Sequence, residues 1–241
     1  MHSYTYALQF VLGARTTMWR MSWMPKAFTE LVGTFFFLTV IALSGKAGAF
    51  GPLAIGIALT AMVYMGGHVS GAHYNPAVSF GAFLRGKMPA SEMLVYWAAQ
   101  LVGAIFAFSV GYLVTGCSGG IHPGAGVQVL QALGVEMVFT AALVVVILNV
   151  AFSKATHGNS FYGIAIGLTI AAAAFVGGPI SGGAYNPAVG FGATLGAAWF
   201  GGGGWSDLWI YVAGPLLGSA IGVGINYVQG LPEVAADHIA E

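Results

Sequence analysis

Long stretches of apolar residues with almost no charge leave this chain few ways to fold. Of its 241 residues, 58% are hydrophobic and only 6% are charged, whereas a soluble domain carries about a quarter charged residues. A membrane-spanning helix needs about 20 mostly apolar residues. Six stretches qualify once the shorter ones are included, at about 24–44, 51–67, 91–114, 128–152, 161–178 and 206–229. The sequence therefore predicts an all-α membrane protein with six transmembrane helices.

Two shorter apolar pieces, at about 76–85 and 187–197, each follow a repeated motif. The motif reads GAHYNPAVSF at 71–80 and GGAYNPAVGF at 182–191. Asparagine is a favoured N-cap and proline a favoured first residue of a helix. Because each piece can reach only about half way across a hydrocarbon layer of about 30 Å, we expect two re-entrant half-helices. In the first half-helix the N-cap is Asn75 and the first two residues are Pro76 and Ala77. In the second they are Asn186, Pro187 and Ala188.

The two halves of the chain form a repeat. A shift of 111 residues aligns 51–81 with 162–192 through both motifs. Each half contains three predicted spans, an odd number, so the second half must enter the membrane upside down relative to the first. We therefore expect an inverted repeat of about 24–114 and 128–229, with the half-helices entering from opposite faces.

Basic residues fall almost entirely on one side of this topology. By the positive-inside rule that side is cytoplasmic, so we expect cytoplasmic terminal segments at 1–23 and 230–241 around a membrane domain at 24–229. We also expect the plasma membrane, or the inner membrane of a bacterium, rather than an organelle. Only Lys46 lies on the other side, against Arg15, Arg20, Lys26, Arg85, Lys87 and Lys154.

Charge and residue types exclude several classes of function. Seven Lys and Arg balance seven Asp and Glu, so the chain offers no basic surface for nucleic acid. A single cysteine, Cys117, excludes an internal disulfide or a multi-cysteine metal site. The sequence contains no recognisable nucleophile and base pair, metal cluster or phosphate loop. We expect no enzyme activity, no cofactor and no metal.

The paired motifs indicate a pore. Non-helical backbone survives at membrane depth only where it is buried in protein or lines a water-filled cavity. The positive ends of two helix dipoles, each about half an elementary charge, converge near the midplane and should repel cations. The carboxamides of Asn75 and Asn186 can each donate a hydrogen bond to a passing oxygen, which interrupts a water chain and disfavours protons. A passive channel for neutral solutes follows.

From about residue 24 to 229 the sequence resembles the aquaporin, or major intrinsic protein, family. The matching segments include HVSGAHYNPAVSFG at 68–81, GGAYNPAVGFG at 182–192 and TELVGTFFF at 29–37. The resemblance implies a homotetramer with one pore in each subunit. It also implies that Glu30 and Glu136 support the loop backbones that line the pore. His73 is expected in the cytoplasmic pore lining, with a pH gate there or at His68 as the alternative to a structural role.

Family members narrow the outer pore with four side chains. Water-specific members place an aromatic residue, a histidine, a small residue and an arginine there, and this chain keeps only the small one. A valine in place of the arginine is similar to some tonoplast intrinsic proteins. Loss of the arginine removes a fixed cation and five donors, so we expect a wider filter that passes water and also ammonia, urea, glycerol or hydrogen peroxide. The four positions are Ile55, Ala174, Gly183 and Val189.

Two alternatives remain open at this point. A strictly water-selective channel is one, because four marker positions do not match the glycerol-facilitator pattern. A secondary transporter is the other, since transporters also use inverted repeats and broken helices. A transporter needs titratable groups near the midplane, and the only acidic candidates, Glu30 and Glu136, are better explained as loop supports. The four marker positions are Gly190, Thr194, Tyr211 and Val212.

Overall fold

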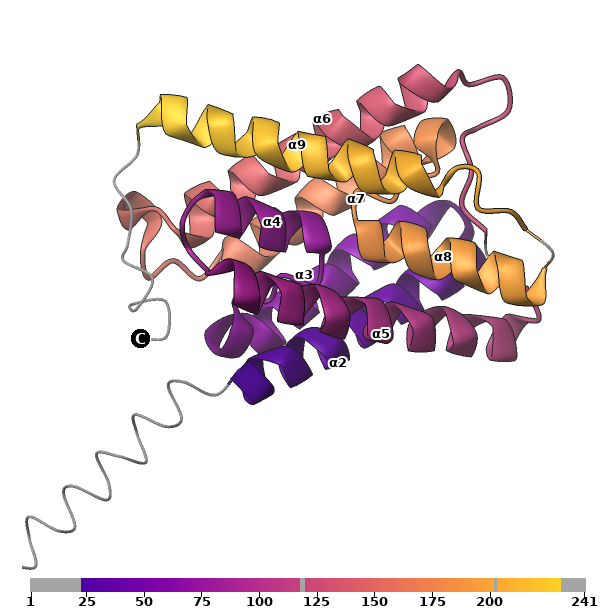
Figure 1. Cartoon of the computed structure of the whole chain (residues 1–241), viewed down its shortest axis with the longest axis horizontal. Helices are drawn as coiled ribbons and strands as arrows, with labels where there is room; N and C mark the ends of the chain where they lie inside the picture. The colour runs from indigo at the N-terminus through magenta and orange to yellow at the C-terminus, as the bar shows by residue number, and fades with distance from the viewer. Residues whose placement is uncertain (1–22, 118–119, 202, 231–241) are drawn as a thin grey trace, which may run out of the picture.

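The computed structural model describes residues 23–117, 120–201 and 203–230, which form a bundle of helices running in the same general direction (Figure 1). No strand occurs within these ranges, so the prediction of an all-α fold is confirmed. Within them, the helices of 20 residues or more are α2 Trp23–Leu43, α3 Gly51–Ser70, α5 Ala90–Thr115, α6 Val129–Ala151, α7 Tyr162–Ser181 and α9 Leu208–Gln229.

Each long helix is apolar enough to lie in a membrane. The stretch from Trp23 to Ser70 qualifies as a whole, and within it α2 and α3 are joined by the 3-10 segment η1 Ser44–Phe50, which is kinked at Gly48 (φ 54°, ψ −129°). The helices α5, α6, α7 and α9 each qualify separately as membrane spans. The observed helices follow the predicted spans to within a few residues. The largest differences are at the ends of α3 and α7, which continue past the predicted residues 67 and 178 to glycine caps in the left-handed conformation.

Two short helices lie between the long ones. They are α4 Pro76–Leu84 and α8 Pro187–Phe200. Figure 1 shows their first turns near the middle of the bundle, from which they run to opposite ends. With nine and 14 residues, neither is long enough to cross a hydrocarbon layer of about 30 Å. Nearly all of the predicted terminal segments lies outside the described residues.

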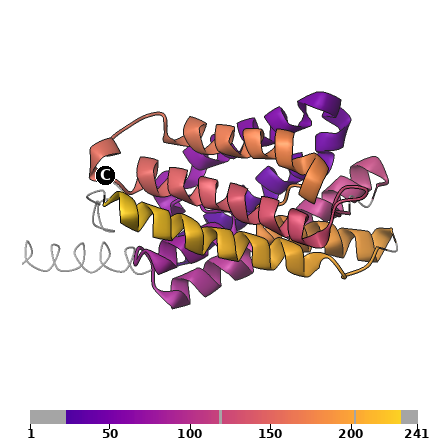
Figure 2. The ribbon, with the colours of Figure 1, turned by 90° about the horizontal axis from the view of Figure 1, so that it is seen from above.

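The long helices pack in pairs that follow the repeat. In the first half α2 packs on α5, and in the second half α6 packs on α9 along much of its length (Figure 2). Between the halves α3 crosses α7, where Gly56 of one helix lies against Gly167 and Ala171 of the other. A Cβ on Gly56 would come within 2.6 Å of both the Gly167 carbonyl oxygen and the Ala171 Cβ. The absence of side chains at these glycines therefore sets the distance between the halves.

Substitution at this crossing tests the packing. In Gly167→Ala the new methyl group would overlap the Gly56 carbonyl oxygen and the Thr60 hydroxyl, and overpacking of this kind costs about 1–3 kcal/mol. We expect a lower melting temperature of the purified protein in detergent. Gly134→Ala on α6 is the control, because a Cβ there meets nothing within 4 Å. Equal melting temperatures for the two variants would contradict a close crossing.

Candidate functional site

Each half-helix begins with an asparagine as its N-cap and a proline as its first helical residue. Asn75 and Asn186 have extended backbones, with φ of −157° and −158°, and each side-chain oxygen accepts a hydrogen bond 2.9 Å long from the backbone N–H two residues later. Pro76 and Pro187 occupy the first helical position, where a missing N–H costs nothing. Local chemistry alone therefore starts both helices inside the bundle.

The same two asparagines join the loops to each other. Asn75 Nδ2 donates to the backbone oxygen of Tyr185 at 2.9 Å, and Asn186 Nδ2 donates to that of Tyr74 at 2.9 Å. A carboxamide nitrogen carries two hydrogens. One hydrogen of each amide is thus used to link the loops, which leaves one for a molecule in the cavity that both asparagines line.

The two tyrosines hold an unusual backbone conformation. Tyr74 and Tyr185 have φ of 48° and 50°, a left-handed region that bulky residues rarely adopt. Their hydroxyls donate to backbone oxygens of α3 and α7, at 3.0 Å to Met62 and 2.9 Å to Ala173. Anchored at the ring, each tyrosine turns its own carbonyl toward the opposite loop.

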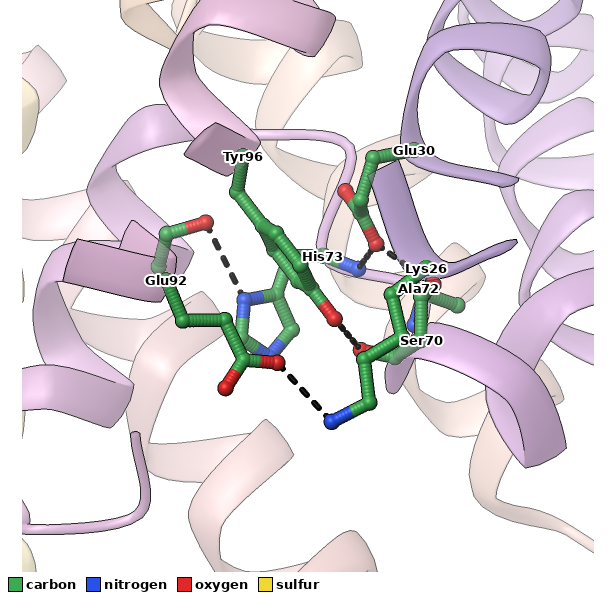
Figure 3. Close-up of polar contacts among 8 residues, drawn as sticks. Lys26, Glu30, Ser70, Ala72, His73, Glu92 and Tyr96 are labelled. Carbon is green, nitrogen blue, oxygen red and sulfur yellow. Dashed lines mark hydrogen bonds and ion pairs between the residues drawn. The ribbon is translucent and has the colours of Figure 1, made fainter. Parts of the chain in front are cut away.

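A buried carboxylate supports the first loop. Glu30 on α2 is 0% exposed, and its oxygens accept from the backbone N–H groups of His73 and Tyr74 at 2.9 and 2.7 Å. The Ser70 hydroxyl at 2.6 Å and Gln100 Nε2 at 2.9 Å also donate to it. Figure 3 shows the Glu30 carboxylate facing Ser70 and the loop at His73. Two backbone N–H groups of the loop are thereby satisfied without water.

Glu136 on α6 supports the second loop in the same way. It is also 0% exposed, and it accepts from the backbone N–H groups of Ala184 and Tyr185 at 3.0 and 2.6 Å and from the Ser181 hydroxyl at 2.7 Å. All three donors lie in the second loop or at the end of the helix before it, so Glu136 holds this loop in place. Both glutamates thus lie where they accept hydrogen bonds from the loop backbones.

Sequence reasoning missed several residues that support the loops. The Tyr96 and Tyr211 hydroxyls donate to the backbone oxygens of Ser70 and Ser181, each at 2.7 Å. Both pairs match across the repeat, the serines at a shift of 111 and the tyrosines at a shift of 115. Polar residues that recur inside apolar segments were therefore the signal that could have identified them.

The first loop has a polar cluster that the second lacks. His73 Nδ1 lies 3.0 Å from Ser79 Oγ, and Gln100 Nε2 lies 3.1 Å from the same oxygen. Ala184, Gly190 and Pro215 hold the corresponding positions in the second half. Of this cluster, His73 lines the central and inner cavities.

A narrow cavity of about 30 Å³ lies between the loops, enough for about two water molecules. Both asparagines line it, together with Ala72 and His73 from the first loop and Gly183 and Ala184 from the second. Apolar side chains of α2, α3, α6 and α7 complete its wall, among them Phe37, Leu59, Leu143 and Ile166.

An outer cavity of about 580 Å³ shares part of this lining. Ile55, Ala174 and Gly183 line both cavities and so stand at the junction between them. The structure thus brings together three of the four residues predicted for the filter. Val189 lines the outer cavity alone and is 2% exposed.

An inner cavity of about 130 Å³ extends the path on the other side. His73 lines both this cavity and the central one, and His68 lines the inner one. Lys26 and Lys87 also line the inner cavity, whereas Lys46 lines the outer one. Three cavities that share lining residues therefore follow one another between the ends of the bundle.

Apolar helices, an inverted repeat and a chain of cavities between re-entrant half-helices define an integral membrane channel. The chain belongs to the major intrinsic protein family, whose model matches residues 17–227.

Relatives and a solved structure agree with this family. The chain is 35% identical over 239 residues to Aquaporin TIP1-2 of Zea mays, covering 88% of this chain and 91% of the relative. It is 38% identical over 185 residues to Probable aquaporin TIP3-2 of Arabidopsis thaliana, covering 76% and 67%. The X-ray structure of the aquaglyceroporin from Plasmodium falciparum matches with a TM-score of 0.76 at 21% identity, covering 85% of this chain and 95% of that one. At that identity the structure supports the fold alone.

Removing a loop-supporting carboxylate should destabilise the protein. In Glu136→Ala the N–H groups of Ala184 and Tyr185 and the Ser181 hydroxyl lose their acceptor, and each unsatisfied buried group costs about 1–3 kcal/mol. We expect a large fall in melting temperature or in the yield of folded protein. The control is Glu92→Ala, which breaks an ion pair to the partly exposed Lys26 and should have a smaller effect. Equal losses would argue against the scaffold role.

Proposed function

We propose that the protein is a passive channel that conducts water and small neutral solutes and excludes protons and ions. The observation that carries this proposal is the meeting of two half-helix starts at Asn75 and Asn186 inside one narrow cavity. Membership of the major intrinsic protein family supports it. A passive channel performs no chemical reaction, so the protein is not an enzyme.

Electrostatics at the central cavity account for the exclusion of ions. Each half-helix directs the positive end of its dipole at the cavity, and each end is equivalent to about half an elementary charge. Cations lose their hydration there without meeting a compensating anion. The free N–H of each amide instead donates to the oxygen of a neutral solute. That orientation interrupts proton transfer along a water chain.

The outer filter sets the solutes that pass. Ile55, Ala174 and Gly183 offer no charged group at the junction of the cavities, and Val189 provides none just outside it. Because none of these four positions carries an aromatic ring or a charge, we infer a wide and apolar filter, which favours passage of ammonia, urea, glycerol or hydrogen peroxide in addition to water. The alternative is a strictly water-selective channel. In that case the small, mainly apolar central cavity would limit passage to water.

Assembly and location complete the proposal. The subunit forms a homotetramer with a pore in each copy, in line with the family resemblance and with the exposed apolar side chains of α3 and α7, such as Ile57, Leu168 and Val176. Both termini face the cytoplasm, on the side where Lys26 and Lys87 lie. The host membrane is the plasma membrane or a bacterial inner membrane.

Stopped-flow light scattering on proteoliposomes tests the function. We expect water, urea and glycerol to cross faster than through protein-free liposomes, because the filter is wide and uncharged. Permeation of water alone would contradict the wide filter. Fluxes that depend on a proton or sodium gradient would indicate a secondary transporter instead.

Val189→Arg tests the outer filter. A fixed guanidinium with five donors would narrow the opening and bind polar solutes, so we expect urea and glycerol permeability to fall by about tenfold or more and water permeability to fall less. Val189→Leu, which adds bulk without charge, is the control in the same assay. Equal reduction of all three solutes by Val189→Arg would show that residue 189 does not face the solute path.

A further inference from the structure

The outer cavity contains one basic side chain. Of the described residues that line it, only Lys46 is charged, and the other polar side chains are those of Ser44, Thr115 and Cys117. Lys46 is exposed, and within the part of the chain that the structure describes no ion pair to it occurs. Its ammonium group is therefore a positive charge in the cavity without a neighbouring carboxylate to neutralise it.

The position of Lys46 is set by η1. Ser44, Gly45, Lys46 and Gly48 of this 3-10 segment all line the outer cavity. Gly48 has φ of 54°, a conformation that glycine adopts at no steric cost, and the kink there lets η1 turn between α2 and α3, on both of which it packs. Thus η1 forms one wall of the cavity, and the lysine is part of that wall.

No other charge lies on the described part of the path from the outer cavity to the central one. The residues shared by the two cavities are Ile41, Ile55, Ala174 and Gly183, and the position where water-specific family members are expected to carry an arginine is Val189. A cleft lined by one sign of charge and by low-dielectric walls focuses the field of that charge. The lysine therefore acts on a charged solute before that solute reaches the half-helices.

We propose that Lys46 is a charge-selecting residue of the outer path. Its ammonium group gives the outer cavity a positive potential, so cations are repelled at the mouth and small anions gather there. Neutral solutes carry no net charge and enter without this effect. The lysine thus supplies, from a different segment, a fixed cation on the side where the filter has Val189. This inference rests on the proposed function, because charge selection matters only on a path that solutes use.

Cys117 provides a reporter of this potential. It is the only cysteine in the chain, is exposed, and lines the same cavity. Two methanethiosulfonate reagents, one bearing a sulfonate and the other a trimethylammonium group, each convert its thiolate to a mixed disulfide and release methanesulfinate. The readout is the ratio of the two second-order rate constants, anionic over cationic, measured by mass spectrometry on the purified full chain in non-ionic detergent. A change in the thiolate fraction affects both rates equally and cancels in the ratio.

Removal of the charge should lower this ratio. We expect a fall of about threefold or more for Lys46→Gln at low salt, and for Lys46→Glu a fall of about the square of that factor, because the charge changes by two units. Both effects should shrink in about 1 M salt, where the Debye length is about 3 Å. In proteoliposomes Lys46→Gln should leave water and urea permeability unchanged, since neither molecule is charged. Cys117→Ser should abolish labelling.

Lys154→Gln is the matched control. It removes the same charge from the 3-10 segment η2 Lys154–Thr156, which lines none of the three cavities, so the ratio should not change. A ratio that is the same for Lys46→Gln and the unaltered protein would overturn the proposal, and so would an equal fall in Lys154→Gln. Failure of the unaltered protein to pass water, with a ratio that still depends on Lys46, would contradict the proposed function instead.

Discussion

Backbone N–H groups in the two re-entrant loops must find acceptors inside the membrane, and the rest of the site depends on how they do so. Water is absent from the hydrocarbon layer, and each unsatisfied group costs several kcal/mol there. Glu30 and Glu136 supply the acceptors from the long helices. With the loops fixed in this way, Tyr74 and Tyr185 can hold left-handed backbones, and the asparagines that follow them lie in one cavity.

The repeat is symmetric in its scaffold and asymmetric in its lining. The glutamates, serines and tyrosines recur in both halves with the same contacts. By contrast, the His73, Ser79 and Gln100 cluster has no counterpart in the second half. His73 is the member of this cluster that lines the central and inner cavities, so a solute meets its imidazole on the inner side and mainly hydrocarbon and glycine at the outer junction. Symmetry therefore describes the scaffold, and the lining departs from it.

Local chemistry explains which features were predictable from the sequence. Asparagine and proline start a helix wherever they lie, so α4 and α8 began at the predicted residues. The end of α7 was predicted too early, at residue 178; the helix continues through Pro179 and ends at Ser181, before Gly182.

Contacts between distant segments were not predictable in the same way. The hydrogen bond from Asn186 to the Tyr74 carbonyl joins residues 112 positions apart, and no local pattern reveals such a pairing. The Phe108 ring on α5 can lie close to α8 because residue 192 of α8 is a glycine. Likewise, only the three-dimensional arrangement shows that Val189 lies outside the junction that Ile55, Ala174 and Gly183 form.

The reciprocal hydrogen bonds between the two loops also make the halves of the chain depend on each other. Each asparagine completes its bonding with a carbonyl from the opposite half. Either half alone would leave one amide hydrogen and one carbonyl without the partners they have in the whole chain. The two repeats, although they resemble separate modules in sequence, are therefore a single cooperative unit, and neither is a domain that could be transplanted without the other.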